Sequence, residues 1–164
     1  MKNFWVLGFL TLLLVGCAAT NAIKETKRAV RGNWVLTTVT YDGNGAFKST
    51  LLQDVSASCF EGSEWYFVAN NNRGTYTITD NDCKTGERKF IWSVPGNKEM
   101  TEGDLLLKIT DANYRSETNA GYQLELATIN ETRMSWRLPA LVNGKTVYIK
   151  KTVYINMNFT KSTK

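Results

Sequence analysis

The sequence predicts an all-β protein, folded as an eight-stranded antiparallel up-and-down barrel. From Gly32 onward, apolar and polar residues alternate with a period of two, as in strands that have one buried face. Turn residues interrupt this alternation at short intervals, and no stretch keeps the apolar spacing of a helix. Short connections favour antiparallel neighbours, and closing the sheet into a barrel leaves no edge exposed to aggregation.

Eight segments carry the strand signal: residues 33–41, 63–69, 74–79, 88–94, 104–110, 121–129, 133–138 and 145–159. The last is long for one strand, so we expect a bulge near Lys150-Lys151. The longest connection, residues 46–58, is a candidate lid or short helical turn in which Leu51 and Leu52 pack down. A membrane-spanning barrel is the rival geometry, but it would turn its apolar face to lipid and its strands would be unusually short.

The N-terminal segment has the features of a secretory signal peptide. Lys2 provides a positive start, residues 4–15 are apolar, and small Gly16 stands directly before Cys17. About a dozen apolar residues are too few for a transmembrane helix, which needs roughly 20. We therefore expect this segment to be removed.

The run Leu14-Val15-Gly16-Cys17 resembles the lipobox of bacterial lipoproteins. The resemblance implies that Cys17 is acylated and becomes the first residue of the mature chain, which is then held on a membrane. The alternative is an ordinary signal peptide cleaved near Ala18-Ala19, with Cys17 discarded. The implied organisation is a signal peptide over residues 1–16, an acylated N-terminus and flexible tether over 17–30, and one barrel domain over 31–164.

The residues after Cys17 predict where such a lipoprotein would be sorted. Ala18 is not the Asp that resembles an inner-membrane retention signal, which favours the outer membrane. Residues 19–30 lack the acidic cluster that some surface lipoproteins carry, which favours the periplasmic face over the cell surface.

The chain is basic, with 20 Lys+Arg against 15 Asp+Glu and a net charge of +5. Four of these basic residues crowd the expected tether: Lys24, Lys27, Arg28 and Arg31. They would either touch anionic lipid head groups or remain solvated. The other basic residues are scattered among acidic ones, so nucleic-acid binding is not expected.

With Cys17 carrying lipid, Cys59 and Cys83 remain as an even pair in an oxidising compartment, where a disulfide is the natural inference. Two free buried thiols are the alternative. The chain contains no histidine and the two cysteines lack ligand spacing, so we expect no metal site.

Catalytic constellations are missing from the sequence. Without histidine the commonest general base and the usual nucleophilic dyads are excluded. Asp80 and Asp82 lie in a turn-rich loop, where aspartate normally stabilises the turn itself. No glycine-rich phosphate loop precedes a helix, and we expect neither an enzymatic activity nor a cofactor.

A family resemblance rests on several motifs together. Gly32-Asn33-Trp34 resembles the Gly-x-Trp signature of the lipocalins, in which the tryptophan closes one end of the barrel. With the lipobox, the run of residues 58–67, Gly74-Thr75-Tyr76 and Cys83, the chain is similar over about residues 30–160 to lipocalin-like lipoproteins common in Bacteroidota. The first connection departs from the family because a turn cluster breaks it and it shows no long lid pattern.

The resemblance implies binding or carriage of a small apolar molecule, or a structural role at the cell envelope. Lipocalins often place a basic residue from a late strand over the signature tryptophan, for which Arg137 and Lys150 are the candidates.

Inward-facing residues of the strands are the candidate lining of a ligand site: Trp65, Phe67, Phe90, Trp92, Tyr122, Leu124, Met134 and Trp136. The same side chains are also enough to fill a small barrel completely. In that case we expect an envelope scaffold or accessory subunit that binds another protein, and clustering of exposed Tyr66, Tyr148 and Tyr154 would favour it. The oligomeric state stays open.

Overall fold

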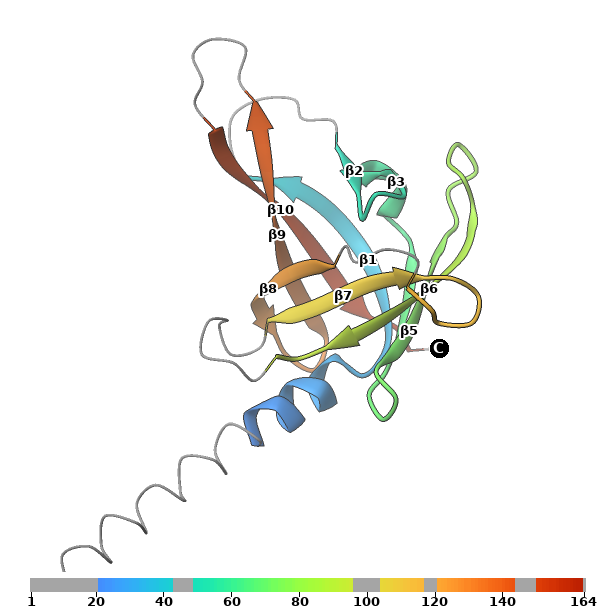
Figure 1. Ribbon diagram of the computed structural model, residues 1–164, viewed down its shortest axis with the longest axis vertical. Coiled ribbons are helices and arrows are strands. Elements are labelled where there is room, and N and C mark those ends of the chain that lie inside the picture. The colour runs from blue at the N-terminus through green and yellow to red at the C-terminus, as the bar shows by residue number, and fades with distance from the viewer. Residues whose placement is uncertain (1–20, 43–48, 96–103, 117–120, 144–149, 164) are drawn as a thin grey trace, which may run out of the picture.

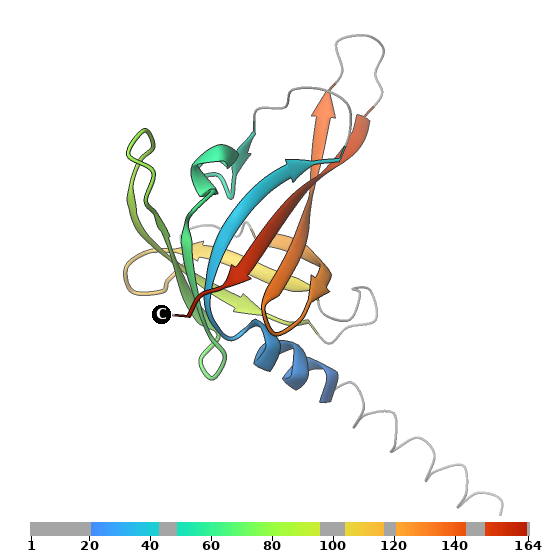
Figure 2. The same ribbon diagram turned by 180° about the vertical axis from the view of Figure 1, so that it is seen from behind.

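The computed structural model describes residues 21–42, 49–95, 104–116, 121–143 and 150–163, with side chains described for all of these except 140–143 and 150–154. A closed antiparallel barrel dominates the fold, with the strand order β1-β10-β9-β8-β7-β6-β5-β4 and closure between β4 and β1 (Figures 1 and 2). The predicted eight-stranded up-and-down barrel is therefore confirmed.

The barrel strands correspond closely to the predicted segments. They are β1 (Gly32–Tyr41), β4 (Glu64–Val68), β5 (Arg73–Ile78), β6 (Gly86–Ser93), β7 (Leu105–Thr110), β8 (Tyr122–Ile129), β9 (Arg133–Asn143) and β10 (Lys150–Lys161). Two short strands, β2 (Thr50–Leu51) and β3 (Val55–Ser56), form a separate hairpin that is followed by the 3-10 helix η1 (Ala57–Phe60).

Period-two patterning determines which side chains enter the barrel. In β4, Trp65 and Phe67 are buried, whereas Glu64 and Tyr66 between and beside them are exposed. Leu36, Phe90 and Leu124 on other strands are likewise fully buried. Burial of these side chains is the main stabilising term of the fold, at roughly 1.5–3 kcal/mol for each large apolar residue.

Gly74 of β5 lies in the barrel wall, directly against the buried ring of Phe90. A Cβ built at Gly74 would stand 2.3 Å from Cζ of Phe90 and 2.6 Å from the Tyr66 carbonyl oxygen. Phe90 is fully buried and pairs directly with Gly74 across β5 and β6, so its ring has no free space to move into.

We expect Gly74→Ala to lower the free energy of unfolding by about 1–3 kcal/mol, the usual cost of overpacking a core. Urea denaturation measures it, with Thr75→Ala on the outer face of the same strand as the control. Equal stability of Gly74→Ala and wild type would contradict the close approach of Phe90.

One end of the barrel is closed by a helix over residues 21–30, seen in blue below the barrel in Figure 1. Its inward side carries Ile23, which packs against the core, and Val30, which is fully buried. Lys27 donates a hydrogen bond to Asn72 Oδ1 at 2.9 Å, in the turn between β4 and β5. No helix in the described part of the chain is both long and apolar enough to cross a membrane.

The helix corrects the expectation of a flexible tether over residues 17–30, which does not hold for residues 21–30. Ile23, Lys27 and Val30 are spaced by four and three residues, the spacing of one helix face, and the residues between them include good helix formers. The high proportion of basic residues in this stretch suggested a solvated linker and concealed that spacing.

The opposite end of the barrel, where β1 ends and β4 begins, carries the segment that we call the cap: residues 49–62, with β2, β3 and η1 (Figure 1). Leu51, Leu52 and Phe60 of the cap are buried, which agrees with the expected packing of Leu51 and Leu52, and η1 is the expected helical turn. Residues 43–48 lie outside the described residues.

A disulfide joins Cys59 of the cap to Cys83 in the β5–β6 connection, with the two Cα atoms 5.9 Å apart. The predicted pairing is confirmed. The bond links the cap to the loop after the β4–β5 hairpin and so holds η1 at this end of the barrel.

The last two strands differ from the prediction in their bounds. β9 continues through Pro139 to Asn143, whereas the predicted strand ended at residue 138. A proline is tolerated there because β8 pairs with β9 only up to Arg137, so no ladder hydrogen bond is lost on that side. Residues 145–149 of the last predicted strand lie outside the described residues.

The predicted bulge near Lys150-Lys151 is wrong, because β10 pairs with β9 without interruption from Lys150 to Thr160. The register shifts instead between Leu36 and Thr38 in β1, where β1 pairs with β10, and between Leu126 and Thr128 in β8. The irregularities therefore lie in β1, which is the strand beside β10, and in β8, which pairs with β9, and not in β10 itself.

Candidate functional site

The interior of the barrel brings together the aromatic residues that the sequence singled out. Trp65 stacks on Phe67 with ring centroids 6.0 Å apart, and Phe67 contacts the rings of Phe90, Trp92 and Trp136 at 5.1, 5.6 and 5.4 Å. All five side chains are at most 2 % exposed. They form one continuous aromatic cluster that fills much of the described interior.

The remaining predicted lining residues are also placed inward. Leu124 and Met134 are buried in the same core, and Tyr122 of β8 packs against it while remaining partly exposed. Whether any of these residues contacts a ligand stays a prediction.

Three interior rings were missing from the predicted set. Tyr76 stacks on Trp65 at 4.7 Å, Phe60 of the cap lies 5.4 Å from Tyr76, and Phe159 of β10 meets Trp136 at 5.1 Å. Tyr76 and Phe159 stand in the inward phase of predicted strands, so the alternation alone could have identified both. Phe60 lies outside any strand and had no such signal.

The closed end of the barrel is organised around Trp34. Its indole N–H donates to the Val30 carbonyl at 2.7 Å, and the Lys161 ammonium lies 4.2 Å from the ring centroid. Lys161 also donates to the Arg31 carbonyl at 2.5 Å. Gly32 has a φ of +112°, a backbone conformation that favours glycine, and a Cβ there would also lie 3.0 Å from Lys161 Nζ.

Lys161 therefore holds the position for which Arg137 and Lys150 were the candidates, and this corrects the prediction. Arg137 of β9 instead lies 3.8 Å from Glu125 in an ion pair across β8 and β9. The Lys150 side chain lies outside the described residues. Partial burial, and to a lesser degree the charge of Arg31, lower the pKa of Lys161.

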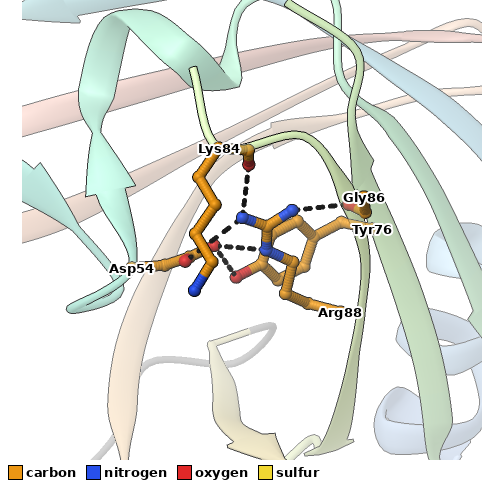
Figure 3. Close-up of polar contacts among 5 residues, drawn as sticks. All are labelled: Asp54, Tyr76, Lys84, Gly86 and Arg88. Atoms are coloured by element: carbon orange, nitrogen blue, oxygen red, sulfur yellow. Dashed lines mark hydrogen bonds and ion pairs between the residues drawn. The ribbon is translucent and has the colours of Figure 1, made fainter.

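The cap end of the barrel carries a cluster of charged and polar side chains that the sequence did not suggest (Figure 3). Asp54, at the tip of the β2–β3 hairpin, forms an ion pair with Arg88 of β6 through Nε and Oδ2 at 2.8 Å. The Tyr76 hydroxyl donates to the same Oδ2 at 3.0 Å. Arg88 Nη2 lies 3.4 Å from Oδ1, so one carboxylate faces three donors.

This cluster is largely shielded from water, since the Arg88 and Asp54 side chains are only 13 % and 16 % exposed. Burial first, and then the Asp54 carboxylate, raise the pKa of Tyr76 far above its usual range. The phenol therefore stays protonated and acts as a hydrogen-bond donor. A buried ion pair of this kind holds geometry firmly, because removing one partner leaves the other charge uncompensated.

Arg88 could have been found from the sequence, because it shares the inward phase of Phe90 and Trp92 in β6. A charged residue at an inward position of a barrel strand requires a partner. Asp54 could not have been found in this way, since it lies in an irregular connection.

The arrangement offers recognition chemistry, with a guanidinium and a phenol aimed at one carboxylate. In the described residues no group of three or more Cys, Asp or Glu side chains is placed to hold a metal ion. Asp80 accepts a hydrogen bond from the Asp82 backbone N–H at 3.0 Å, the turn-stabilising contact expected for this loop.

The turn that presents Asp54 is strained. Leu52 and Gln53 have φ angles of 53° and 55°, in the left-handed region that glycine or asparagine normally occupies, and the Asp54 N–H closes the turn onto the Leu51 carbonyl at 3.1 Å. Leu52 is buried, whereas Gln53 is exposed. The contacts of Leu52 and Asp54 hold the turn in this conformation.

We expect Gln53→Gly to raise the free energy of unfolding by about 0.5–1 kcal/mol, because glycine adopts this φ without a steric penalty. Thermal unfolding followed by circular dichroism measures the gain, and Gln53→Ala, which keeps the Cβ, should give none. A Gln53→Gly variant no more stable than wild type would show that the turn is not strained.

The outer face of the barrel has a hollow of about 270 Å³ lined mainly by polar residues of β1, β4, β5 and β6. Exposed Tyr66 lies on it, beside Glu64 and Glu87. Tyr148 and the Tyr154 side chain lie outside the described residues, so the predicted tyrosine cluster stays a prediction.

In a comparison with known families, the family model described as a lipocalin-like domain matches residues 30–136. No match was found among curated proteins or among solved structures.

Proposed function

We propose that this chain, which belongs to the lipocalin-like domain family, is a membrane-anchored lipoprotein whose barrel binds or carries a small hydrophobic molecule in the cell envelope. The closed barrel with its apolar interior fits the binding role typical of this family, and we assign no enzymatic role. Cys17 is the proposed lipid attachment site, and the periplasmic face of the outer membrane is the proposed location.

The observation that carries the binding role is the attachment of the cap to the barrel mouth, by which we mean the end of the barrel where β5 ends and β6 begins, with Tyr76 and Arg88. Asp54 reaches inward-facing Arg88 and Tyr76 above an aromatic interior. A barrel that served only as a rigid body would be sealed more simply by apolar side chains, because a buried ion pair contributes little net stability. A polar contact between the cap and the barrel wall is suited to a cap that has to move away from the barrel end.

Binding is tested by titrating the full chain, held in phosphatidylcholine nanodiscs, with a panel of fatty acids and retinoids while tryptophan fluorescence is followed. We expect saturable quenching by at least one class. Leu124→Phe, which fills interior space, should weaken it, whereas Leu106→Phe on the exposed outer face should not. Saturation by no member of the panel would reject the carrier function.

The anchor is tested separately by expressing Cys17→Ser and fractionating the cells. We expect the variant to leave the membrane fraction, because a lipidated cysteine provides the attachment. The paired Cys59→Ser and Cys83→Ser variant is the control and should remain membrane-bound. A Cys17→Ser chain that stays in the membrane fraction would contradict the lipoprotein proposal.

A second candidate function is an envelope scaffold or accessory subunit with a filled barrel. Two observations favour it: the ring-to-ring packing from Trp65 to Trp136, and the polar hollow around exposed Tyr66 on the outer face. Co-purification from detergent with one defined protein, lost in Tyr66→Ala and kept in Leu106→Ala, would favour this function over the carrier.

A further inference from the structure

We propose that Arg88 and Tyr76 form a carboxylate-binding site in the mouth of the barrel, that Asp54 of the cap occupies this site as a built-in substitute, and that the cargo is an amphiphile with a carboxylate head. The inference rests on the proposed carrier function, and it names the class of molecule carried.

Arg88 is held in its binding orientation by contacts that do not involve Asp54. Nη1 donates to the Gly86 carbonyl and Nη2 to the Lys84 carbonyl, each at 2.6 Å, and both carbonyls belong to the β5–β6 side of the mouth (Figure 3). These bonds leave the Nε edge of the guanidinium facing Asp54. If Asp54 withdraws, the guanidinium keeps its orientation and becomes a prepared receptor for a carboxylate.

Tyr76 completes the receptor from the neighbouring strand. It pairs directly with Arg88 across β5 and β6, and its hydroxyl donates to the oxygen that Arg88 Nε holds. A protonated phenol and a guanidinium both donate, so the site matches an acceptor with negative charge. A neutral or cationic head group would leave the buried guanidinium uncompensated.

The cap resembles such an amphiphile chemically. Its hairpin presents the Asp54 carboxylate next to Leu51 and Leu52, whose side chains are buried in the core. An incoming molecule with a carboxylate head and an apolar chain would replace both kinds of contact together. The ligand would then form its own hydrophobic interactions and its own charge pair in place of those of the cap. This keeps the free-energy difference between the cap-bound state and the ligand-bound state small.

The hairpin is a small unit that can move without opening the barrel. Among the described residues, β2 and β3 form a separate two-stranded sheet without ladder pairing to the barrel strands, and the Ser49 hydroxyl just before β2 forms a hydrogen bond with the Tyr41 hydroxyl of β1 at 2.9 Å. Behind it, η1 is fixed by the Cys59–Cys83 disulfide and by buried Phe60. In this proposal the part that moves is the hairpin that carries Asp54, Leu51 and Leu52, while η1 stays in place.

The experiment compares a bromine-labelled octadecanoic acid with its methyl ester as tryptophan quenchers, using the full chain in phosphatidylcholine nanodiscs. In wild type we expect the acid to bind at least tenfold more tightly than the ester. Asp54→Asn should strengthen acid binding about tenfold further, because the competing carboxylate is neutralised, and leave ester binding unchanged. Asp82→Asn, an exposed aspartate in the β5–β6 connection, is the charge-matched control and should change neither.

Tyr76→Phe provides a second test that does not depend on the folding of the Asp54 variant. It removes one hydroxyl and should weaken acid binding roughly tenfold with no effect on the ester. If acid and ester bind equally in wild type and in all variants, the carboxylate site is rejected while the carrier function stands. If neither quenches in any variant, the carrier function itself is rejected.

Discussion

Replacing Trp65 with alanine is expected to lower the free energy of unfolding by about 3–5 kcal/mol, the range found when a large buried aromatic residue is truncated. The Trp65 ring contacts Tyr76, Phe67, Phe90 and Phe159 within 4.7–6.0 Å. Its indole N–H also donates to the buried Ser63 hydroxyl at 2.8 Å, so the substitution leaves a cavity and removes one of the two hydrogen bonds of that hydroxyl, which still donates to the Phe60 carbonyl.

Guanidinium denaturation followed by far-ultraviolet circular dichroism measures the loss, and Trp65→Phe, which keeps one ring, should lose less than half as much. The size of the loss also bears on the two candidate functions. A loss below about 1 kcal/mol would mean that the neighbouring rings collapse into the space, which is not the behaviour of a tightly packed core.

Breaking the disulfide is expected to be the next largest effect. Cys59 and Cys83 are 24 residues apart, and opening a loop of this size restores about 3 kcal/mol of chain entropy to the unfolded state. For a domain of this size we expect the melting temperature to fall by about 10 °C on reduction.

Scanning calorimetry with and without reductant measures the shift, and a chain with both cysteines replaced by serine should not respond to reductant. Alkylation of both thiols in the native, non-reduced protein would contradict the bridge.

The sequence was sufficient to predict the barrel because alternation is read locally and repeats in every strand. Trp65, Phe67 and Phe90 were assigned to the interior on that basis and lie there. The helix of residues 21–30 is not predicted, because the basic residues of this stretch indicate a solvated linker even though Ile23, Lys27 and Val30 have the spacing of one helix face. Lys161 was missed because its contact with Trp34 joins the two ends of the chain, which no local pattern reports.

The candidate site likewise has one part that the sequence predicts and one part that it does not. The aromatic interior follows from strand phase, whereas the Asp54 contact depends on how an irregular cap folds back over the mouth. Leu52 shows why: leucine normally has a negative φ, yet Leu52 has a φ of 53° and its side chain is buried in the core.

The helix of residues 21–30 and the cap lie at opposite ends of the barrel (Figure 1). In a chain anchored through Cys17, just before that helix, the closed end would face the supporting bilayer and the mouth would point away from it. Such a protein would receive or deliver its cargo on the side remote from its own leaflet. The orientation of the barrel on its anchor would then determine on which side the cargo is exchanged. A partner protein or an opposing membrane would meet the cap first.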